Sequence, residues 1–454
     1  MKLNRYYTLS MLFALLCTSA AAQKKPLFDG KTLNGWKVIT GKAPYVVENG
    51  MIVGTMVKES ANSFLVTEKE YGDFILELDV KLEGTTSNTG VQTRSHFDPA
   101  RNNGSGAVYG RQMEIDPTAR AWTGGIYDES RRLWLYPLEL NPAAKSAYKV
   151  EEFNHYRIEC IGNETKTWVN GVPVAYVIDT LDKSGFIGLQ VHSIGNRTEL
   201  VGKKVYFKNI NIQTEKLDSQ SFPKGIYTVN LTPNSLSAYE KSNGYKLLFD
   251  GTSNAGWIGA KTSAFPQKGW NIANGQLSVL PSGGGESTNG GDIVTKEDFA
   301  AFDLSFEFKL SEGANSGVKY FVTLAEKSTG SAIGLEYQVL DDEKHPDAKM
   351  GRDGNRTLAS LYDLMTAKKE ARFLRPIGAW NNGRLVVHPN GKVEHYLNGV
   401  KVIEYTRGSE EFRKLVAISK YKDWKNFGEA PKGRILLQDH GDKVSFRTIK
   451  IKNL

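Results

Sequence analysis

The sequence predicts an all-β protein made of two tandem β-sandwiches. Three observations support this fold class: one set of motifs occurs twice in the same order, apolar residues alternate with a period of two, and Asn-Gly pairs separate strand-like runs. Long helical periodicity is scarce, and glycine is abundant at 45 of 454 residues. Many short strands joined by Gly and Asn turns are typical of antiparallel β-sandwiches.

The duplication is clearest where each copy begins. The stretch "LFDGKTLNGW" starts at residue 27 and "LFDGTSNAGW" at residue 248, with six of ten residues the same. Solenoid repeats recur about every 20–50 residues, so a recurrence this distant indicates a duplicated domain. Further pairs follow in the same order: "FILELDVKL" (74–82) with "FDLSFEFKL" (302–310), "NTGV" (88–91) with "NSGV" (315–318), "GIYDE" (125–129) with "SLYDL" (360–364), "WVNGVPV" (168–174) with "YLNGVKV" (396–402), and "GFIGLQVHS" (185–193) with "GRILLQDHG" (433–441).

Period-two patterning predicts individual strands within each copy. In residues 74–82, apolar side chains alternate with charged ones, and residues 302–310 repeat the pattern. Such alternation predicts a half-buried strand in each copy. The Asn-Gly pairs inside 168–174 and 396–402 predict tight hairpin turns, because this pair favours the backbone of a two-residue hairpin loop.

The motifs also define the predicted domains. Copy one covers residues 24–213 and copy two covers residues 245–454. Between them, residues 214–244 form a polar linker with a short helix, for which Thr232 is the expected N-cap and Pro233 the first residue. We expect this linker to pack on the second domain.

The N-terminus predicts export. Residues 1–22 combine Lys2 and Arg5 with a short apolar run and small residues before Gln23, which is the order of a secretory signal peptide. The apolar run is too short to cross a bilayer, and no later stretch is long enough for a transmembrane segment. We therefore expect a periplasmic or extracellular protein, with a lipid anchor at Cys17 as the alternative.

Composition narrows the expected partners. The formal net charge is +8, but acidic and basic residues alternate without a long basic block, so no nucleic-acid partner is expected. Removal of the signal peptide leaves Cys160 as the single cysteine, which excludes an intramolecular disulfide. Its position in the alternating run "YRIECI" indicates a small buried hydrophobe rather than a nucleophile. No cofactor is required by the sequence.

The motifs together resemble the 3-keto-disaccharide hydrolase domain family. Copy one resembles it through "LFDGKTLNGW", "NTGVQTRS", "RQMEID", "GGIYDE", "WVNGVPV" and "GLQVH", and copy two through "LFDG", "NSGV", "GLEYQVLDDEKHPDA" and "SLYDL". The resemblance implies a concanavalin-A-like jelly-roll sandwich, similar to endo-glucanases, with a concave face that binds sugar. It also implies a carbohydrate substrate, namely a glycoside whose sugar carries a ketone at carbon 3.

Acids and amides alternate on one predicted strand of each copy. The strand "RQMEID" places its polar residues on one face, and "LEYQVLDD" does the same and ends in two aspartates. Such a row can hydrogen-bond sugar hydroxyls and hold one carboxylate as a general acid or base. The alternative, an ordinary solvated sheet face, is disfavoured by the recurrence and by the resemblance. The residues concerned are Gln112, Glu114, Asp116, Glu336, Gln338 and Asp341.

A histidine ends the last apolar run of each copy. His192 and His440 occupy the same place in their copies, and Gln190 and Gln438 precede them by two residues and share their face. A histidine there can transfer protons, bind a hydroxyl or ligate a metal. The alternative is a structural histidine held by a loop carbonyl.

Copy two also offers a candidate metal site. His345 lies near Asp341 and Asp342 in "DDEKHPDA", although the spacing follows no established ligand pattern. A divalent metal is therefore a candidate ligand of copy two alone.

Aromatic and charged residues gather in "GGIYDESRRLWLYP" (124–137). Aromatic faces stack on sugars, and arginine can stabilise a developing enolate. The alternative for the tryptophan is that it covers the core. The candidate substrate-binding residues are Tyr127, Glu129, Arg131 and Trp134 with Tyr362 as a counterpart in copy two, and Arg94 and Arg111 as further cations that favour an anionic or enolate-like ligand.

The ketone implied by the resemblance changes the expected chemistry. It acidifies the proton at carbon 2, so a base can remove that proton and the oxygen on carbon 1 can leave by elimination, after which water adds. We assign Glu114 and Glu336 as candidate bases or acids and His192 and His440 as candidate proton donors or enolate stabilisers, with Asp116 and Asp341 as further candidate catalytic carboxylates. The alternative function is a non-catalytic tandem carbohydrate-binding protein.

Overall fold

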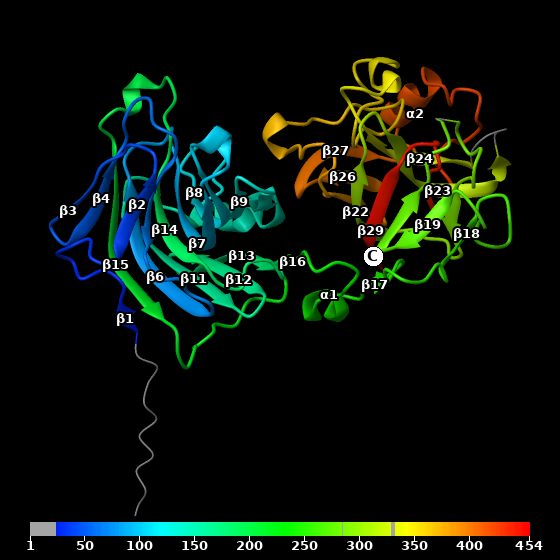
Figure 1. Cartoon of the computed structure of the whole chain (residues 1–454). Helices are drawn as coiled ribbons and strands as arrows, with labels where there is room; N and C mark the ends of the chain where they lie inside the picture. The colour runs from blue at the N-terminus through cyan, green and yellow to red at the C-terminus, as the bar shows by residue number, and fades with distance from the viewer. Residues whose placement is uncertain (1–23, 284, 328–331) are drawn as a thin grey trace, which may run out of the picture.

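The computed structural model describes residues 24–283, 285–327 and 332–454, so the predicted signal peptide lies outside the described residues. Figure 1 shows two β-rich domains side by side, joined by a segment that carries the short helix α1. The predicted fold class, two tandem β-sandwiches, is confirmed. Within the described ranges, no helix is long and apolar enough to cross a membrane.

The first domain consists of a nine-stranded and a seven-stranded sheet, and nearly all pairs are antiparallel. The nine-stranded sheet contains, in spatial order, β16 (Val229–Asn230), β13 (Val172–Ile178), β12 (Glu164–Val169), β11 (Asn154–Ile161), β6 (Phe74–Leu82), β15 (Lys204–Gln213), β4 (Met51–Thr55) and β3 (Tyr45–Glu48), with β1 (Lys25–Pro26) beside β15. The seven-stranded sheet contains β10 (Leu133–Tyr136), β9 (Ile126–Glu129), β8 (Ala107–Ile115), β7 (Thr89–Asp98), β14 (Phe186–Val191), β5 (Ser63–Thr67) and β2 (Trp36–Thr40).

The second domain repeats this plan with an eight-stranded and a five-stranded sheet. The eight-stranded sheet contains β19 (Trp270–Ala273), β20 (Gln276–Val279), β29 (Val444–Asn453), β22 (Phe302–Leu310), β25 (Asn381–Val387), β26 (Lys392–Leu397) and β27 (Val400–Thr406), with β17 (Lys246–Leu247) beside β29. The five-stranded sheet contains β18 (Trp257–Gly259), β21 (Ile293–Thr295), β28 (Arg434–Leu437), β23 (Asn315–Lys327) and β24 (Ala332–Leu340).

Helical elements are short and lie in the connections. The α-helices are α1 (Ala238–Ser242) and α2 (Glu410–Ala417), and the 3-10 turns are η1 (Asn102–Gly104), η2 (Leu138–Leu140), η3 (Pro142–Ala147), η4 (Thr198–Leu200), η5 (Pro346–Lys349) and η6 (Ala371–Phe373).

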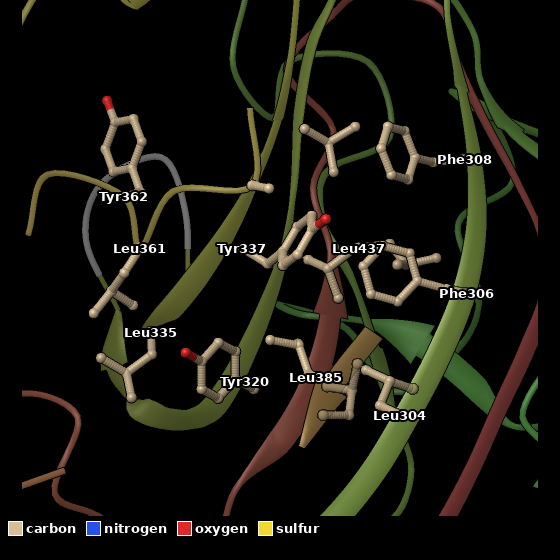
Figure 2. Packing of buried hydrophobic residues seen from close by; sticks show 14 of the residues in the cluster. Leu304, Phe306, Phe308, Tyr320, Leu335, Tyr337, Leu361, Tyr362, Leu385 and Leu437 are labelled. Carbon is tan, nitrogen blue, oxygen red and sulfur yellow. The ribbon is translucent and has the colours of Figure 1, made fainter. Parts of the chain in front are cut away.

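Each domain has its own apolar core between its two sheets. In the second domain, Figure 2 shows Tyr337 of β24 turned towards Phe306 of β22, and the two rings meet edge to face with centroids 5.3 Å apart. Burial of such large rings contributes much of the stability of a core. In the first domain Cys160 is fully buried in the core and unpaired, as predicted.

The predicted strands and hairpins are confirmed, with one difference in burial. β6 and β22 have the expected bounds, and the Asn-Gly pairs lie between β12 and β13 and between β26 and β27. The prediction that residues 302–310 form a half-buried strand is wrong, because the polar face of β22 is buried as well. There Asp303 pairs with Arg384 and accepts a hydrogen bond from Tyr245, so an ion pair and the first residue of copy two cover this face.

The linker helix exists, but it begins later than predicted. The N-cap of α1 is Ser237, whose hydroxyl accepts from the backbone N–H of Glu240, while Glu240 accepts from the N–H of Ser237. This reciprocal capping box fixes the helix start. Thr232 is therefore not the cap; its N–H instead donates to the side chain of Asn230.

The linker and a loop of the second domain connect the two halves. Glu240 pairs with Lys450 of β29, so the linker packs on the second domain as predicted. In addition, Phe373 of η6 packs into the core cluster of the first domain, with its ring 5.3 Å from that of Trp122. The two copies are therefore in direct contact.

Candidate functional site

Strand register shows which residues of the two copies are equivalent. Gly90 lies opposite Glu114 in copy one, whereas the equivalent glycine, Gly317, lies opposite Gln338 in copy two. Two positions further along, Gln92 lies opposite Gln112 and Lys319 lies opposite Glu336, so Gln112 of copy one corresponds to Glu336. The two candidate glutamates, Glu114 and Glu336, therefore occupy different positions, because acid and amide have exchanged places.

The glycine of "NTGV" and "NSGV" is required by this arrangement. A Cβ on Gly90 would lie 2.3 Å from the Gln112 side chain, and a Cβ on Gly317 would lie 2.1 Å from Oε1 of Glu336. These distances are far shorter than van der Waals contact. The missing side chain thus lets the residue of the neighbouring strand lie across the sheet.

A chain of amides leads to Glu114 on the outer face of the first domain's seven-stranded sheet. Gln92 donates to Oε1 of Gln112 at 2.8 Å, and Gln112 donates to Oε2 of Glu114 at 2.9 Å. Asn88 donates to the other oxygen of Glu114 at 2.7 Å. This network orients the carboxyl group, and Gln112 and Glu114 share a face as predicted.

Burial changes the protonation of two carboxyl groups on this face. It raises the pKa of Glu114 to about 8, against the opposing effect of the Gln112 hydrogen bond, and the charges of Asp116 and Glu129 raise it further. Burial likewise raises the pKa of Glu129 to about 7. Tyr127 lies two residues before Glu129 on β9, opposite Gln112. Burial raises the pKa of Tyr127 as well, so its phenol stays neutral. Two carboxyl groups that titrate near neutral pH can serve as acid and base.

Gln190 of β14 and His192, directly after that strand, lie at one end of the same face. Nδ1 of His192 lies 2.6 Å from the carbonyl oxygen of Ser193, which makes Nδ1 the hydrogen-bearing atom. Burial lowers the pKa of His192, so the ring is neutral and its Nε2 accepts rather than donates protons. The structure therefore does not support His192 as a proton donor. The side chain of Gln190 is fully buried, and its amide makes no hydrogen bond among the described residues.

The arginines of copy one do not lie on this face. Arg111 is on the inner side of β8 and contacts Asp179 at 2.9 Å, and Arg94 contacts Asp73 at 2.7 Å and two backbone carbonyls. Arg131 pairs with Asp128 and Asp182. Their charges are therefore balanced inside the protein, and the inference that they attract an anionic ligand is wrong.

Asp116 and Trp134 also have structural partners. Asp116 comes directly after β8 and accepts from Thr118 and Arg120, so its oxygens shape the following loop. Trp134 is 5% exposed and packs between Tyr127 and Trp122, with ring centroids 5.3 and 4.6 Å away. It therefore supports Tyr127 from behind, in agreement with the core-covering alternative.

The equivalent face of copy two carries different charges. Lys319 replaces Gln92 and its Nζ lies 3.9 Å from Oε2 of Glu336. Burial raises the pKa of Glu336, while Lys319 and Lys420 oppose that rise. Gln338 occupies the position of Glu114, and Leu364 replaces Glu129 in the aligned motif. The described part of this face therefore contains no counterpart of the Glu114–Glu129 pair.

The remaining candidates of copy two lie around the ends of β24 and β28. The hydroxyl of Tyr362 donates to Asp347 at 2.8 Å, and Gln438 donates to Glu286 at 3.0 Å. Asp341 accepts from the backbone N–H groups of Glu343 and Lys344 in its own loop and of Gly313 in the loop before β23, and Asp342 pairs with Lys369. The structure does not bring these two aspartates to His345; it brings His440 and Asp442 there instead.

Sequence reasoning missed several residues of the copy-one site. Gln92 lies two residues after Gly90, so the alternation that placed Gln112 and Glu114 on one face could have placed it there too. Asn62, which donates to Glu129 and accepts from the N–H of Ser193, has no such signal, because it reaches the face from a loop. Arg120, stacked over Trp122 and Trp134, is also a loop residue.

The chain is similar to several known proteins. A 3-keto-disaccharide hydrolase of Bacteroides thetaiotaomicron is 37% identical over 234 residues, which span 47% of this chain and 79% of that protein. A crystal structure of a candidate glycosyl hydrolase from Parabacteroides distasonis is 29% identical, with a TM-score of 0.43, and the match covers 49% of this chain and all of that one. A carbohydrate-binding module from Bacillus subtilis is 16% identical, with a TM-score of 0.28 over 39% of this chain and 95% of that one.

The family comparison covers both copies. The family described as the 3-keto-alpha-glucoside-1,2-lyase-like domain matches residues 23–213 and again residues 244–452. The predicted resemblance, the tandem arrangement and the prediction of a glycoside hydrolase-type enzyme are confirmed. The chain belongs to the 3-keto-alpha-glucoside-1,2-lyase-like domain family, as a tandem pair of its domains.

Proposed function

We propose that this protein is an exported enzyme that cleaves 3-keto-glycosides by elimination across carbons 1 and 2, and that copy one performs the chemistry. The observation that carries this proposal is the raised pKa of two carboxyl groups on one sheet face, about 8 for Glu114 and about 7 for Glu129. The family description, which names a 1,2-lyase, and the name of the Bacteroides relative support the substrate class.

The reaction needs three groups. A base takes the proton from carbon 2, which is acidic because carbon 3 is a ketone, and the electron pair forms an enolate. A hydrogen-bond donor stabilises the enolate oxygen. The enolate then re-forms the ketone as a double bond forms between carbons 1 and 2 and the bond from carbon 1 to its oxygen breaks, while an acid protonates the departing oxygen. Addition of water to this double bond completes a net hydrolysis.

The environments of the side chains assign these roles. Glu129, with the lower pKa, is ionised to a substantial degree at neutral pH and acts as the base. Glu114, with the higher pKa, retains its proton and acts as the acid. The neutral phenol of Tyr127 donates to the enolate oxygen. Tyr127 lies on β9, two residues before Glu129 and opposite Gln112 of β8. Such divergence of two carboxyl pKa values is how one site provides both acid and base.

Neighbouring amides are suited to hold the sugar. Gln190 presents a buried amide whose oxygen and nitrogen have no partner among the described residues. A sugar hydroxyl can both donate to that oxygen and accept from that nitrogen. Since an unpaired buried amide is costly, ligand binding would relieve this cost and add to affinity.

Export is part of the proposal and rests on the sequence of residues 1–22. Mass spectrometry of the protein secreted by its host should find an N-terminus near Gln23. A mature chain that begins at a lipidated Cys17 would replace this part of the proposal with a membrane-anchored protein.

The chemistry is tested by reaction in deuterium oxide. The full chain is incubated with a 3-keto-disaccharide and, as a control, with the unmodified disaccharide. Elimination followed by addition of water places solvent deuterium on carbon 2 of the product, and the unmodified sugar is not cleaved. Cleavage without deuterium at carbon 2 would exclude elimination, and binding without cleavage would favour the carbohydrate-binding alternative.

A further inference from the structure

Two histidines and an aspartate converge at one end of the five-stranded sheet of copy two. Nε2 of His345 lies 4.0 Å from Oδ2 of Asp442, and Nδ1 of His440 lies 3.9 Å from the same oxygen. One ligand atom from each of the three residues lies within 4.8 Å of the other two. The two imidazole rings meet edge to face at a centroid distance of 5.6 Å.

The loops that carry these residues are held by several hydrogen bonds. The buried carboxylate of Asp439 accepts from the N–H groups of Gly290, Gly291 and Gly441, and so fixes the turn between His440 and Asp442. Oδ2 of Asp442 accepts from the N–H of Asn315 at 3.0 Å. Supports of this kind orient metal ligands before the ion arrives.

His345 is held from its own side. The carbonyl of Asp341 accepts from the N–H of His345, and the carboxylate of Asp341 accepts from two backbone N–H groups of the same loop and from that of Gly313. Asp341 therefore positions His345 rather than binding the ion itself. Nδ1 of His345 accepts a long hydrogen bond, 3.2 Å, from the N–H of Asp347. Coordination of a metal ion through Nε2 requires the ring proton on Nδ1, so this weak hydrogen bond would be lost on binding.

The nitrogen atoms of the cluster are suited to a cation. Nδ1 of His440 is buried and makes no hydrogen bond among the described residues. A buried histidine nitrogen that makes no hydrogen bond among the described residues, near a carboxylate that a second histidine also approaches, is the arrangement expected of an incomplete coordination shell.

We infer that His345, His440 and Asp442 form a site in copy two for one divalent transition-metal ion of the zinc class. Two imidazole nitrogens and one carboxylate oxygen favour Zn²⁺ over Ca²⁺ and Mg²⁺, which prefer shells of oxygen ligands. Three protein ligands leave a coordination position open. Because ligand atoms around one Zn²⁺ lie about 3–4 Å apart, the side chains need only small inward movements.

Copy one cannot form this site. Its equivalent histidine, His192, is followed by Ile194 where copy two has Asp442, and the ring of His192 is tied to the carbonyl of Ser193. The positive charges of Arg197 and Arg120 act on His192 there, in addition to its burial. Copy one thus has fixed cationic side chains near the position at which copy two binds a metal ion.

The inference does not rest on the proposed elimination, and its test measures binding alone. The full chain, without an affinity tag and freed of metal by a chelator, is titrated calorimetrically with ZnCl₂, MnCl₂ and CaCl₂. We expect one Zn²⁺ per chain, with no comparable site for Ca²⁺. Substitution with Co²⁺ should give visible absorption bands of a nitrogen- and oxygen-ligated ion, which is a signature independent of stability.

Variants identify the ligands. His440→Ala and Asp442→Asn, tested separately, should each weaken Zn²⁺ binding by at least the roughly 10–100-fold that loss of a supporting residue costs. The matched control, His192→Ala in copy one, should leave the titration unchanged. A wild-type chain that binds no Zn²⁺, or equal Zn²⁺ affinity in the wild type and both ligand variants, would overturn the inference.

Discussion

The two copies share a sheet and differ in the charges placed on it. Copy one has Glu114 and Glu129 with amides around them, and both carboxyl groups titrate near neutral pH because they are buried. In copy two, an amide stands in place of the first carboxyl group, and the remaining acid, Glu336, faces Lys319. The comparison shows that the catalytic potential of this face depends on which strand position holds the carboxyl group and on which charged side chains lie near it.

An opposite charge nearby is the physical reason that the copies diverge. A buried carboxyl without a cation keeps its proton until near-neutral pH, which makes it a general acid or base. In copy two, Lys319 and Lys420 oppose the rise that burial causes in the pKa of Glu336, which makes its carboxyl group easier to ionise than it would be without them. One duplicated frame can thus supply a reactive face in one domain and a different ligand site in the other.

The largest expected effect is the loss of the proposed base. Glu129→Gln should lower kcat/KM for a 3-keto-disaccharide by about 10²–10⁴-fold, which is the usual contribution of general acid–base catalysis. Steady-state kinetics of the full chain measures this. Glu139→Gln, which alters a partly exposed carboxylate paired with Lys145, is the control and should leave the rate unchanged. A full rate in the Glu129 variant would refute its role as base.

A tyrosine pair compares the copies directly. Tyr127→Phe removes the proposed donor to the enolate and should lower kcat by about 10²–10³-fold, as for other lost oxyanion donors. Tyr362→Phe removes only a hydrogen bond to Asp347 in copy two and should change kcat by less than about twofold. Equal losses in both variants would mean that the copies act alike.

The pH profile tests the assigned protonation states. The base must be ionised, so kcat/KM should rise with pH through about 7, and the acid must keep its proton, so the rate should fall through about 8. The result is a narrow bell whose two apparent pKa values belong to the coupled pair. In Glu129→Gln the residual activity should lose the acidic limb. A profile that is flat from pH 6 to 9 would contradict the assignments.

The smallest expected effect is on stability, and its size differs between the copies. The pKa of Glu114 rises from 4.5 to about 8 on folding, so its stabilising contribution is present below about pH 4.5 and is lost as pH rises towards 8. Glu114→Gln should therefore raise the melting temperature by several °C at pH 8 and by little at pH 5, given about 2–4 °C per kcal/mol for domains of this size. Burial also raises the pKa of Glu336, so Glu336→Gln should change the melting temperature in the same direction, but by less, because Lys319 and Lys420 oppose that rise. Thermal melts at both pH values check these signs, and a lower melting temperature for Glu114→Gln at pH 8 would contradict the burial argument.

The fold was predictable because its signals are local or repeated. Alternation defined β6 and β22, Asn-Gly pairs defined the hairpins, and collinear motifs defined the duplication. The burial of the polar face of β22 was not predictable, because the residues that pair with Asp303 lie far from it in the sequence. They are Tyr245, at the start of copy two, and Arg384 of β25.

The candidate site was predictable in part for the same reason. Alternation placed Gln112 and Glu114 on one face, but an alternating strand carries no information about which residue of its neighbour lies opposite. The exchange of acid and amide between the copies therefore emerged only from the register. The partners of Arg111 and of His345 lie tens of residues away in the sequence, so neither ion pairing nor the histidine cluster could be read from spacing.

The central claim, that the reactive carboxyl groups reside in copy one, is tested most directly by one matched pair of rates. Glu114→Gln and Glu336→Gln are each introduced into the full chain, and release of sugar from a 3-keto-disaccharide is measured at the same pH. The account predicts a loss of about 10²–10⁴-fold for Glu114→Gln and a change of less than about twofold for Glu336→Gln. Equal losses, or a larger loss for Glu336→Gln, would contradict it.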